Sequence, residues 1–256
     1  FGLIDFQPSE LAKVANILMV SFILSRKDIS NYFSSFPPLI SVLLIYRQPD
    51  FGTVFIIILC YFVLMYISGI SVPIILTAIF SGISALFILI EFNLLKSWQI
   101  SRLTNFFSQS GSGDFSQQQS RLAISSGGLF GRSNEHLINY GEIFVPVKTT
   151  DFIFSSFAEN FGFVGVIILF SVWMQIFYKS VKAVQTIDTE YGKYLLIGLM
   201  TLLIVQLYIN LGTVTGYLPV TGLPFPMLSL GGSSIAMNAI VFGILNRIFI
   251  ENRVYI

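Results

Sequence analysis

The chain has 256 residues, of which 54% are hydrophobic and 11% are charged, whereas an average soluble domain has about 25% charged residues. This composition excludes an ordinary soluble domain and predicts an integral membrane protein built from apolar spans of about 20 residues. A formal net charge of +1 argues against nucleic-acid binding. The single Cys60 and single His136 exclude an intramolecular disulfide and a His-rich metal site, so any bound cation would need oxygen ligands.

Seven apolar segments follow one another along the chain, and they predict an all-α, polytopic bundle of about seven transmembrane helices in a single domain, 1–256. Prolines punctuate the second segment at both ends, which predicts a short, tilted or irregular helix there. The expected spans are 11–25, 36–46, 52–69, 72–93, 158–178, 194–211 and 232–250.

Lys and Arg residues in the short connections predict the orientation of the bundle. If the chain crosses the membrane seven times, these basic residues share one face, which is then cytoplasmic. The N-terminus, the turn at 48–50, the 94–157 segment and the 212–231 loop then share the external face. The basic residues are Arg26, Lys27, Lys179, Lys182, Lys193, Arg247 and Arg253.

Two external segments stand out by composition. The 94–157 segment is too long for an ordinary connection, and loops beyond about 15 residues are usually functional or disordered. Its first half, at 108–120, has a flexible composition, whereas its second half predicts a partly ordered cap that includes an amphipathic interfacial helix. The stretch 218–234 carries three prolines and three glycines. It predicts non-helical backbone close to whatever occupies an external cavity.

Three carboxylates, Glu10, Asp50 and Asp151, lie in polar motifs at the ends of these spans. Ionisable groups at such positions are costly and indicate a functional site by default. Structural roles are open for each of them. Glu10 and Lys13, three residues apart, can form an interfacial salt bridge with Lys13 extended towards the headgroups. Asp50 can cap the N-terminus of the third span.

Asp151 follows two threonines and precedes an aromatic run that leads into the fifth span. Burial at the lipid boundary would raise its pKa towards working pH, as suits a general base. The alternative is that Asp151 caps the N-terminus of that span. Glu159, two turns further on, either orients Asp151 or faces a neighbouring helix.

Five motifs in order resemble the FtsW/RodA/SpoVE family of bacterial cell-wall synthesis, over essentially the whole chain. The family has ten spans, so this chain resembles spans four to ten and is expected to lack the first three. The first motif looks more like the FtsW branch, which favours division over elongation. The motifs are Phe6-Gln7-Pro8-Ser9-Glu10-Leu11-Ala12-Lys13, Gln48-Pro49-Asp50-Phe51-Gly52-Thr53, Ser126-Gly127-Gly128-Leu129-Phe130-Gly131, Thr150-Asp151-Phe152-Ile153-Phe154, and Leu218-Pro219-Val220-Thr221-Gly222-Leu223-Pro224 with Gly231-Gly232-Ser233-Ser234.

The resemblance implies a multi-pass peptidoglycan glycosyltransferase that polymerises lipid II at the outer face of the bacterial cytoplasmic membrane. Asp151 corresponds to the family's essential acidic residue and would act as the base on the acceptor 4-hydroxyl. The same motifs and their neighbourhood supply the expected substrate cavity. Its residues are Glu10, Lys13, Asp50, Gln7, Gln48, Glu159, Arg102, Arg121 and Ser233.

Charge on the leaving undecaprenyl pyrophosphate must be balanced, by Lys13, Arg102, Arg121 or a divalent cation such as Mg²⁺ or Mn²⁺. No organic cofactor is expected. The implied partners are lipid II, the undecaprenyl-linked glycan, a class B penicillin-binding transpeptidase and other divisome or elongasome membrane proteins. Two other functions remain open. Charges lining a cavity would also suit a lipid II flippase, and the span surfaces would suit a non-catalytic scaffold for a transpeptidase.

Overall fold

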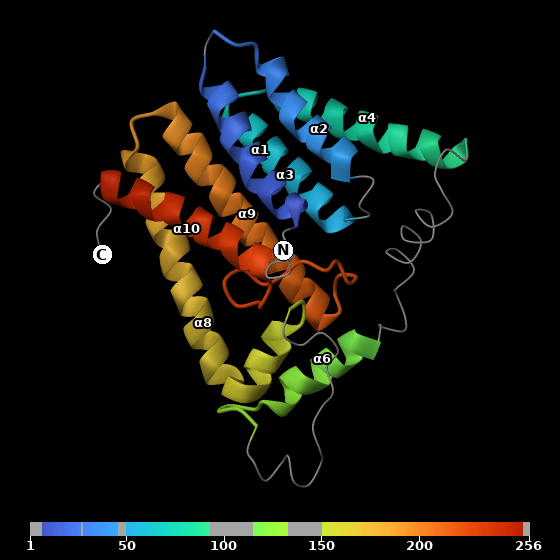
Figure 1. The fold of residues 1–256 in the computed structure, drawn as a ribbon, viewed down its shortest axis with the longest axis vertical. Helices are drawn as coiled ribbons and strands as arrows, with labels where there is room; N and C mark the ends of the chain where they lie inside the picture. Colours follow the sequence, from blue (N-terminus) through green and yellow to red (C-terminus); the bar gives the residue numbers. More distant parts are fainter. Residues whose placement is uncertain (1–6, 27, 46–49, 93–114, 133–149, 253–256) are drawn as a thin grey trace, which may run out of the picture.

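The structure, a computed structural model, describes residues 7–26, 28–45, 50–92, 115–132 and 150–252. The secondary-structure elements of this described part are all helices, which confirms the all-α prediction (Figure 1). The elements are α1 (Pro8–Ser25), the 3₁₀ turn η1 (Asn31–Ser35), α2 (Phe36–Ile45), α3 (Phe51–Ile67), α4 (Val72–Glu91), α6 (Phe115–Ser126), α8 (Ile153–Thr186), α9 (Glu190–Thr215) and α10 (Gly232–Glu251).

Seven of these helices, all except α6, correspond to the seven predicted spans. Four of them, α1, α8, α9 and α10, are long and apolar enough to cross a membrane. The apolar stretches within α2, α3 and α4 are shorter. The second span is the shortest, with only 10 helical residues after its 3₁₀ turn, as the flanking prolines predict. The fold is therefore a polytopic membrane bundle.

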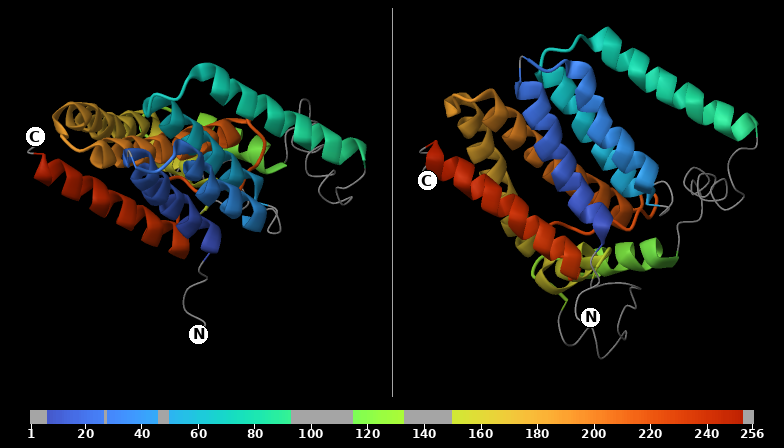
Figure 2. Two further views of the ribbon diagram at one scale, coloured as in Figure 1. Left: turned by 90° about the horizontal axis from the view of Figure 1, so that it is seen from above. Right: turned by 45° about the horizontal axis from the view of Figure 1, so that its top comes forward.

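Helix α9 forms the centre of the bundle, and α1 and α3 pack closely against it (Figure 2). The approach of α1 to α9 depends on Gly198, because a Cβ built there would lie 2.6 Å from Ile17 Cγ2. Small residues at such crossings let membrane helices pack backbone to backbone. Helix α4 lies at the edge, where it contacts α3 and extends away from the other helices.

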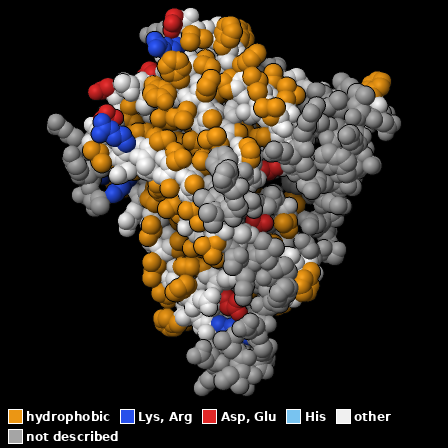
Figure 3. Space-filling model, in the orientation of Figure 1, with side chains coloured by type: hydrophobic (Ala, Val, Ile, Leu, Met, Phe, Trp, Pro, Cys, Tyr) orange, Lys and Arg blue, Asp and Glu red, His pale blue; other side chains and the backbone are white. Residues whose placement is uncertain are grey.

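Five of the basic residues that predict the cytoplasmic face belong to the described part of the chain, and the helix ends that carry them lie towards the upper left of Figure 1. They are Arg26 directly after α1, Lys179 and Lys182 in the final part of α8, Lys193 in the first turn of α9, and Arg247 near the end of α10. Figure 3 shows the molecular surface in the orientation of Figure 1. The described part of this surface is largely hydrophobic, and most of its Lys and Arg side chains lie towards the upper left. The polar motifs gather at the opposite ends of the helices.

Helix α8 differs from the predicted fifth span, 158–178, because it begins at Ile153 and ends at Thr186. Gly162 interrupts it with φ 63° and ψ −166°, a conformation open essentially only to glycine. The segment before this break therefore lies at an angle to the long apolar segment after it (Figure 1). The first helical residues after Asp151 are thereby set at an angle to the long apolar span, at the helix ends opposite to those that carry the basic residues.

The stretch between α9 and α10 has no helix, as its prolines and glycines predict. Helix α9 ends at Thr215, and its C-cap residue Gly216 has a left-handed φ of 83°, as is typical of a glycine that terminates a helix. We call residues 216–231 the C-terminal external loop.

Candidate functional site

Glu10 and Lys13 lie in the first turns of α1, where Pro8 occupies the start of the helix. Lys13 Nζ lies 2.7 Å from Glu10 Oε1, and the two side chains are only 2% and 5% exposed. The predicted pairing is therefore present. Lys13 does not extend towards the headgroups, however, because its charge is satisfied inside the protein by Glu10.

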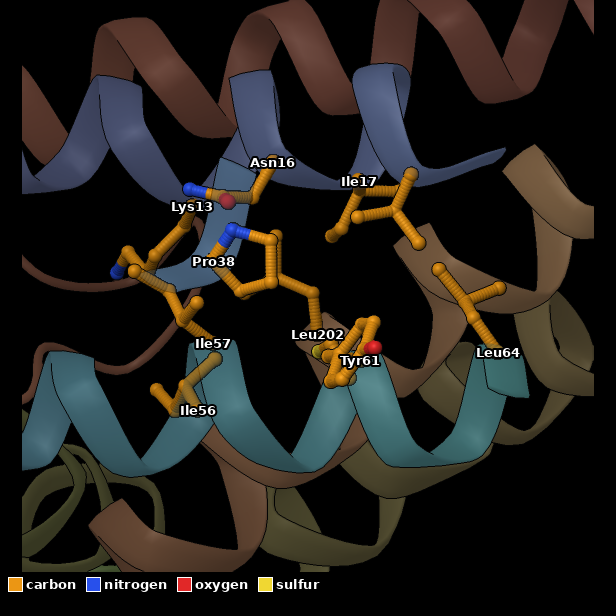
Figure 4. Close-up of a pocket in the computed structure, with 11 residues that line it drawn as sticks. Lys13, Asn16, Ile17, Pro38, Ile56, Ile57, Tyr61, Leu64 and Leu202 are labelled. Carbon is orange, nitrogen blue, oxygen red and sulfur yellow. The ribbon is translucent and has the colours of Figure 1, made fainter. Parts of the chain in front are cut away.

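The stem of Lys13 lines a small cavity deeper in the bundle (Figure 4). Helices α1, α2, α3 and α9 enclose it, mostly with apolar side chains such as Ile17 and Leu64. Asn16 lies at the same side and donates hydrogen bonds from Nδ2 to Ala12 O and to Ser41 Oγ, both at 2.7 Å. Because this lining is apolar, an unpaired charge here would be buried without water, and the loss of either Glu10 or Lys13 would therefore cost more free energy than at the surface.

Asp50 caps the N-terminus of α3, which confirms the structural role predicted for it. Its Oδ1 accepts a hydrogen bond from Thr53 N at 3.1 Å. Its Oδ2 accepts hydrogen bonds from Ser9 Oγ at 3.2 Å and from Gln7 Nε2 at 3.4 Å. One carboxylate thus joins the starts of α1 and α3 and brings the first two motifs together.

Asp151 is held in place through its main chain. The carbonyl oxygen of Asp151 accepts a hydrogen bond from Asn210 Nδ2 at 2.8 Å, and the preceding carbonyl of Thr150 accepts one from Ser229 Oγ at 2.6 Å. Residue Phe152, not Asp151, is the N-cap of α8, and its cap has no side-chain hydrogen bond. The predicted capping role of Asp151 is therefore wrong, and its carboxylate stays available.

Burial raises the pKa of the Asp151 carboxyl above its ordinary value, and a hydrogen bond with the Thr150 side chain offsets part of this rise. The physical cause is desolvation, which disfavours the charged form of a carboxylic acid. A carboxylate with a raised pKa is a stronger base, so Asp151 is suited to accept a proton from a hydroxyl group.

The C-terminal external loop connects the two acidic motifs. A Cβ built on Gly52, two residues after Asp50, would lie 3.0 Å from Leu223 Cγ. A Cβ built on Gly222 would lie 4.0 Å from Asp151 Oδ2. The start of α3 and the Asp151 turn therefore border the same short stretch, 221–223. The structure thus brings Gln7, Glu10, Lys13, Asp50 and Asp151 to one external region.

Asn210 is the residue of this region that the sequence analysis missed. Its Nδ2 donates to Asp151 O and to Leu223 O, both at 2.8 Å, and the residue is 1% exposed. The signal was visible, because Asn210 and Gln206 lie one turn apart in an otherwise apolar helix. Polar residues inside a membrane span are costly and usually have a partner.

Replacing Asn210 by Asp tests this bridge without changing the side-chain volume. We expect Asn210→Asp to lose both hydrogen bonds, at a cost of about 1–3 kcal/mol, because a carboxylate oxygen cannot donate. Asp151 would then be displaced, and the polymerisation activity implied by the family resemblance should fall by at least about tenfold. The matched control is Asn160→Asp, since Asn160 is exposed and bonds only to Ser156 O in its own helix. Equal activities of the two variants, measured with the same substrate, would contradict the role of Asn210.

Glu159 does not orient Asp151. Its Oε1 lies 2.7 Å from Arg132 Nη1, and Arg132 N donates to Glu159 O at 2.8 Å. This double contact joins the segment after α6 to the first part of α8. The alternative prediction is that Glu159 faces a neighbouring helix; its partner Arg132 lies instead in the segment just after α6. Nothing in the local sequence of Arg132 indicates this pairing.

Glycines make this junction between α6 and α8 close enough for backbone hydrogen bonds. Phe163 N donates to Gly128 O at 2.9 Å, and Val164 N donates to Leu129 O at 3.0 Å. A Cβ on Gly131 or Gly162 would collide with the facing backbone. The glycine motif 127–131 thus serves to dock α6 on the break in α8.

We expect Gly162→Ala to destabilise the protein, because alanine would adopt a strained backbone costing about 1–3 kcal/mol and its Cβ would lie 2.7 Å from Leu129 C and O. The measurement is the apparent melting temperature in detergent. Gly243→Ala is the control, since its Cβ would meet nothing within 4 Å, and alanine favours a helix over glycine. A melting temperature for Gly162→Ala as high as that of Gly243→Ala would contradict the docking role.

The remaining predicted residues are placed as follows. Ser233 is buried at the second position of α10. Arg121 on α6 lies beside Gly216, because a Cβ there would be 3.4 Å from Arg121 Nη1. Gln48 and Arg102 lie outside the described residues. The described residues contain no group of three or more His, Cys, Asp or Glu side chains that could hold a metal ion.

Fold and site together define a multi-pass membrane protein with a polar centre where its external loops meet. The chain belongs to the FtsW/RodA/SpoVE family, whose sequence profile, described as "Cell cycle protein", matches residues 1–254. It is a protein of the bacterial cytoplasmic membrane.

Two relatives show the extent of the similarity. The chain is 32% identical over 259 residues to the peptidoglycan glycosyltransferase MrdB of Escherichia coli K12, covering 96% of this chain and 69% of that protein. It is 30% identical over 262 residues to the stage V sporulation protein E of Bacillus subtilis 168, covering 95% and 68%. The chain thus spans about two thirds of the length of these relatives.

Solved structures agree with the fold. A chain in a structure described as the structural coordination of polymerization and crosslinking by a peptidoglycan synthase complex aligns with a TM-score of 0.72 and 27% identity, covering 96% of this chain and 70% of that one. The rod shape determining protein RodA of Thermus thermophilus aligns with a TM-score of 0.61 and 26% identity, covering 97% and 66%.

Proposed function

We propose that this chain is a peptidoglycan glycosyltransferase that polymerises lipid II into glycan strands at the outer face of the cytoplasmic membrane, in cell division or elongation. The observation that carries the proposal is Asp151: its carboxyl is half-buried and has a raised pKa, and its main chain is held by Asn210, which donates to Asp151 O, and by Ser229, which donates to Thr150 O. It lies at the external ends of the spans, where a lipid-linked sugar would present its head group.

In this reaction Asp151 takes the proton from the 4-hydroxyl of the acceptor sugar. The hydroxyl oxygen then forms a bond to the anomeric carbon of the donor, with inversion, and the bond to undecaprenyl pyrophosphate breaks. Proton transfer of this kind contributes about 10²–10⁴-fold to a rate. The fixed main chain of Asp151 supplies the positioning on which such a transfer depends.

The leaving pyrophosphate requires a positive counter-charge. Lys13 is a poor candidate, because Glu10 already neutralises it in a buried pair. A divalent cation such as Mg²⁺ fits better, because this ion keeps several waters and needs only one or two carboxylates besides the phosphates. Asp50 is the carboxylate of this region that is left for such an ion once Asp151 acts as the base. When bound, the cation would supply charge neutralisation of the leaving group.

A crosslinking partner follows from the same proposal. The chain resembles a protein from a complex described as coordinating polymerization and crosslinking, so we expect a class B penicillin-binding transpeptidase to act beside it. The product strand would then pass directly from the polymerase to the crosslinking enzyme.

The test is polymerisation of purified lipid II by the chain reconstituted in its complete membrane assembly. The wild type should yield glycan strands, and Asp151→Asn should yield none that gel electrophoresis detects. Asp188→Asn is the matched control, because Asp188 lies exposed in the α8–α9 connection. Polymerisation by Asp151→Asn at the wild-type rate would remove the proposed base. Head-group translocation in proteoliposomes without polymerisation would instead favour a flippase.

A further inference from the structure

Helix α6 crosses the external end of the bundle and contacts both α8 and α9 (Figure 1). Its buried residues, Gln117, Ser120 and Ala123, are spaced three apart and form one face. Two of these three are polar, although they are 2% and 0% exposed. Buried polar side chains of this kind need partners, and the partners identify what α6 does.

Gln117 and Ser120 cap the C-terminal end of α9. The last carbonyls of a helix have no partner within the helix. Gln117 Nε2 donates to Thr213 O at 3.0 Å and, beyond the helix end, to Leu218 O at 2.8 Å. Ser120 Oγ donates to Val214 O at 2.7 Å. Helix α6 thus adds a second donor to Thr213 O, which also accepts from Gly216 N at 3.1 Å, and supplies a donor to Val214 O.

Ser120 also contacts the first turn of α8. Its Oγ lies 2.6 Å from Ser155 Oγ, and Ser155 is 0% exposed. A serine hydroxyl has one hydrogen to donate. Because Ser120 gives its hydrogen to Val214 O, Ser155 must be the donor in the serine pair. The order Ser155 to Ser120 to Val214 is therefore a directed chain of hydrogen bonds from α8 to α9.

A positively charged side chain on α6 also lies at the C-terminal end of α9. Arg121, next to Ser120, lies beside Gly216 at the end of α9. A positive group at a helix C-terminus is stabilising because it faces the negative end of the helix dipole. This accounts for Arg121 without a direct role towards pyrophosphate.

We propose that Gln117 and Ser120 are positioning residues for Asp151. Ser155 lies four residues after Asp151 at the start of α8. Leu218 lies in the C-terminal external loop, which also contributes Leu223, and the Asn210 side chain bonds to both Leu223 and Asp151. The α6 pair therefore fixes, from outside the site, both elements between which Asp151 lies. This inference rests on the proposed function, because positioning matters for catalysis only if Asp151 is the base.

The test compares Ser120→Ala and Gln117→Met with the control Ser125→Ala. Ser125 is on the same helix but exposed, and its hydroxyl donates only to Leu122 O. We expect kcat for lipid II polymerisation to fall about 10²-fold in the first two variants, with KM unchanged, since misplacement of a catalytic group by about 1 Å costs this much. The control should keep the wild-type rate.

The pH profile separates positioning from a merely structural role. A loosened Asp151 turn would admit water, so the acid limb of kcat should move to lower pH in Ser120→Ala. Partial unfolding alone would lower the amplitude and leave the midpoint unchanged. Hydrogen exchange should also increase in peptides covering 152–158 and 213–218, but not in the centre of α9.

Failure of this inference differs from failure of the proposed function. A wild type that does not polymerise lipid II would contradict the proposed function. An active wild type, with Ser120→Ala and Gln117→Met matching Ser125→Ala in rate, pH midpoint and hydrogen exchange, would overturn the positioning role alone.

Discussion

Polymerisation by the wild-type chain is expected to decline as the pH is lowered, with a midpoint above the usual range of an aspartic acid. The base form of Asp151 is the carboxylate, and burial raises its pKa. The reactive carboxylate form is therefore fully populated above this raised pKa, and its population falls as the pH is lowered through it. Initial rates of lipid II consumption between about pH 4 and 9 would define the limb.

The Asp151→Asn variant measures how much the carboxylate contributes to the rate. Asp151→Asn should lower kcat by about 10²–10⁴-fold and abolish the acid limb in any residual activity, while Asp188→Asn keeps both rate and profile. A residual activity of Asp151→Asn that still falls at the wild-type midpoint would show that another group titrates, and the assignment of the base would be wrong.

The second large effect concerns stability. Lys13→Met should lower the free energy of unfolding by about 3–5 kcal/mol, because it leaves Glu10 charged, buried and unpaired. Glu10 and Lys13 are 5% and 2% exposed at their side chains, with 2.7 Å between the charged atoms. The double variant Glu10→Gln, Lys13→Met should recover much of the loss, since no uncompensated charge remains.

The chain contains a matched control for this pair. Lys193 and Glu190 have the same three-residue spacing at the start of α9, but their side chains are 33% and 53% exposed and 3.3 Å apart. Exposed pairs of this kind contribute about 0–1 kcal/mol, so Lys193→Met should be nearly neutral. Unfolding titrations in mixed detergent would compare the variants. Equal losses in Lys13→Met and Lys193→Met would contradict the importance of burial.

The sequence predicts the span architecture well, because apolar runs and basic connections report directly on the membrane. It misplaces the ends of α8 and α9, because these helices continue beyond their apolar stretches. Where a helix stops depends on its capping residues and glycines, not on hydrophobicity alone. The extra residues Ile153 to Phe157 illustrate this, because they are helical outside the predicted span. Gly162 interrupts the helix a few residues later, and no periodicity in the sequence indicates its positive φ.

The site is only partly visible in the sequence. Glu10, Asp50 and Asp151 stand out because charge is rare in this chain. Gln117 and Ser120 do not, because α6 lies in a segment of flexible composition and its partners on α9 are 94 or more residues away. Such contacts depend on how loops meet after the spans have packed, and local patterns carry no information about them.

The Asp151 region is expected to face the outside of the cell, since the proposed reaction takes place there. Single cysteines at Asp151, Tyr217 and Asp188, in a Cys60→Ala background, test this with a membrane-impermeant maleimide on right-side-out and inside-out vesicles. Cys60 is buried, so its removal should not disturb the surface, and Tyr217 is 89% exposed. We predict labelling of positions 151 and 217 in right-side-out vesicles and of position 188 only in inside-out vesicles. The reverse pattern would contradict the account.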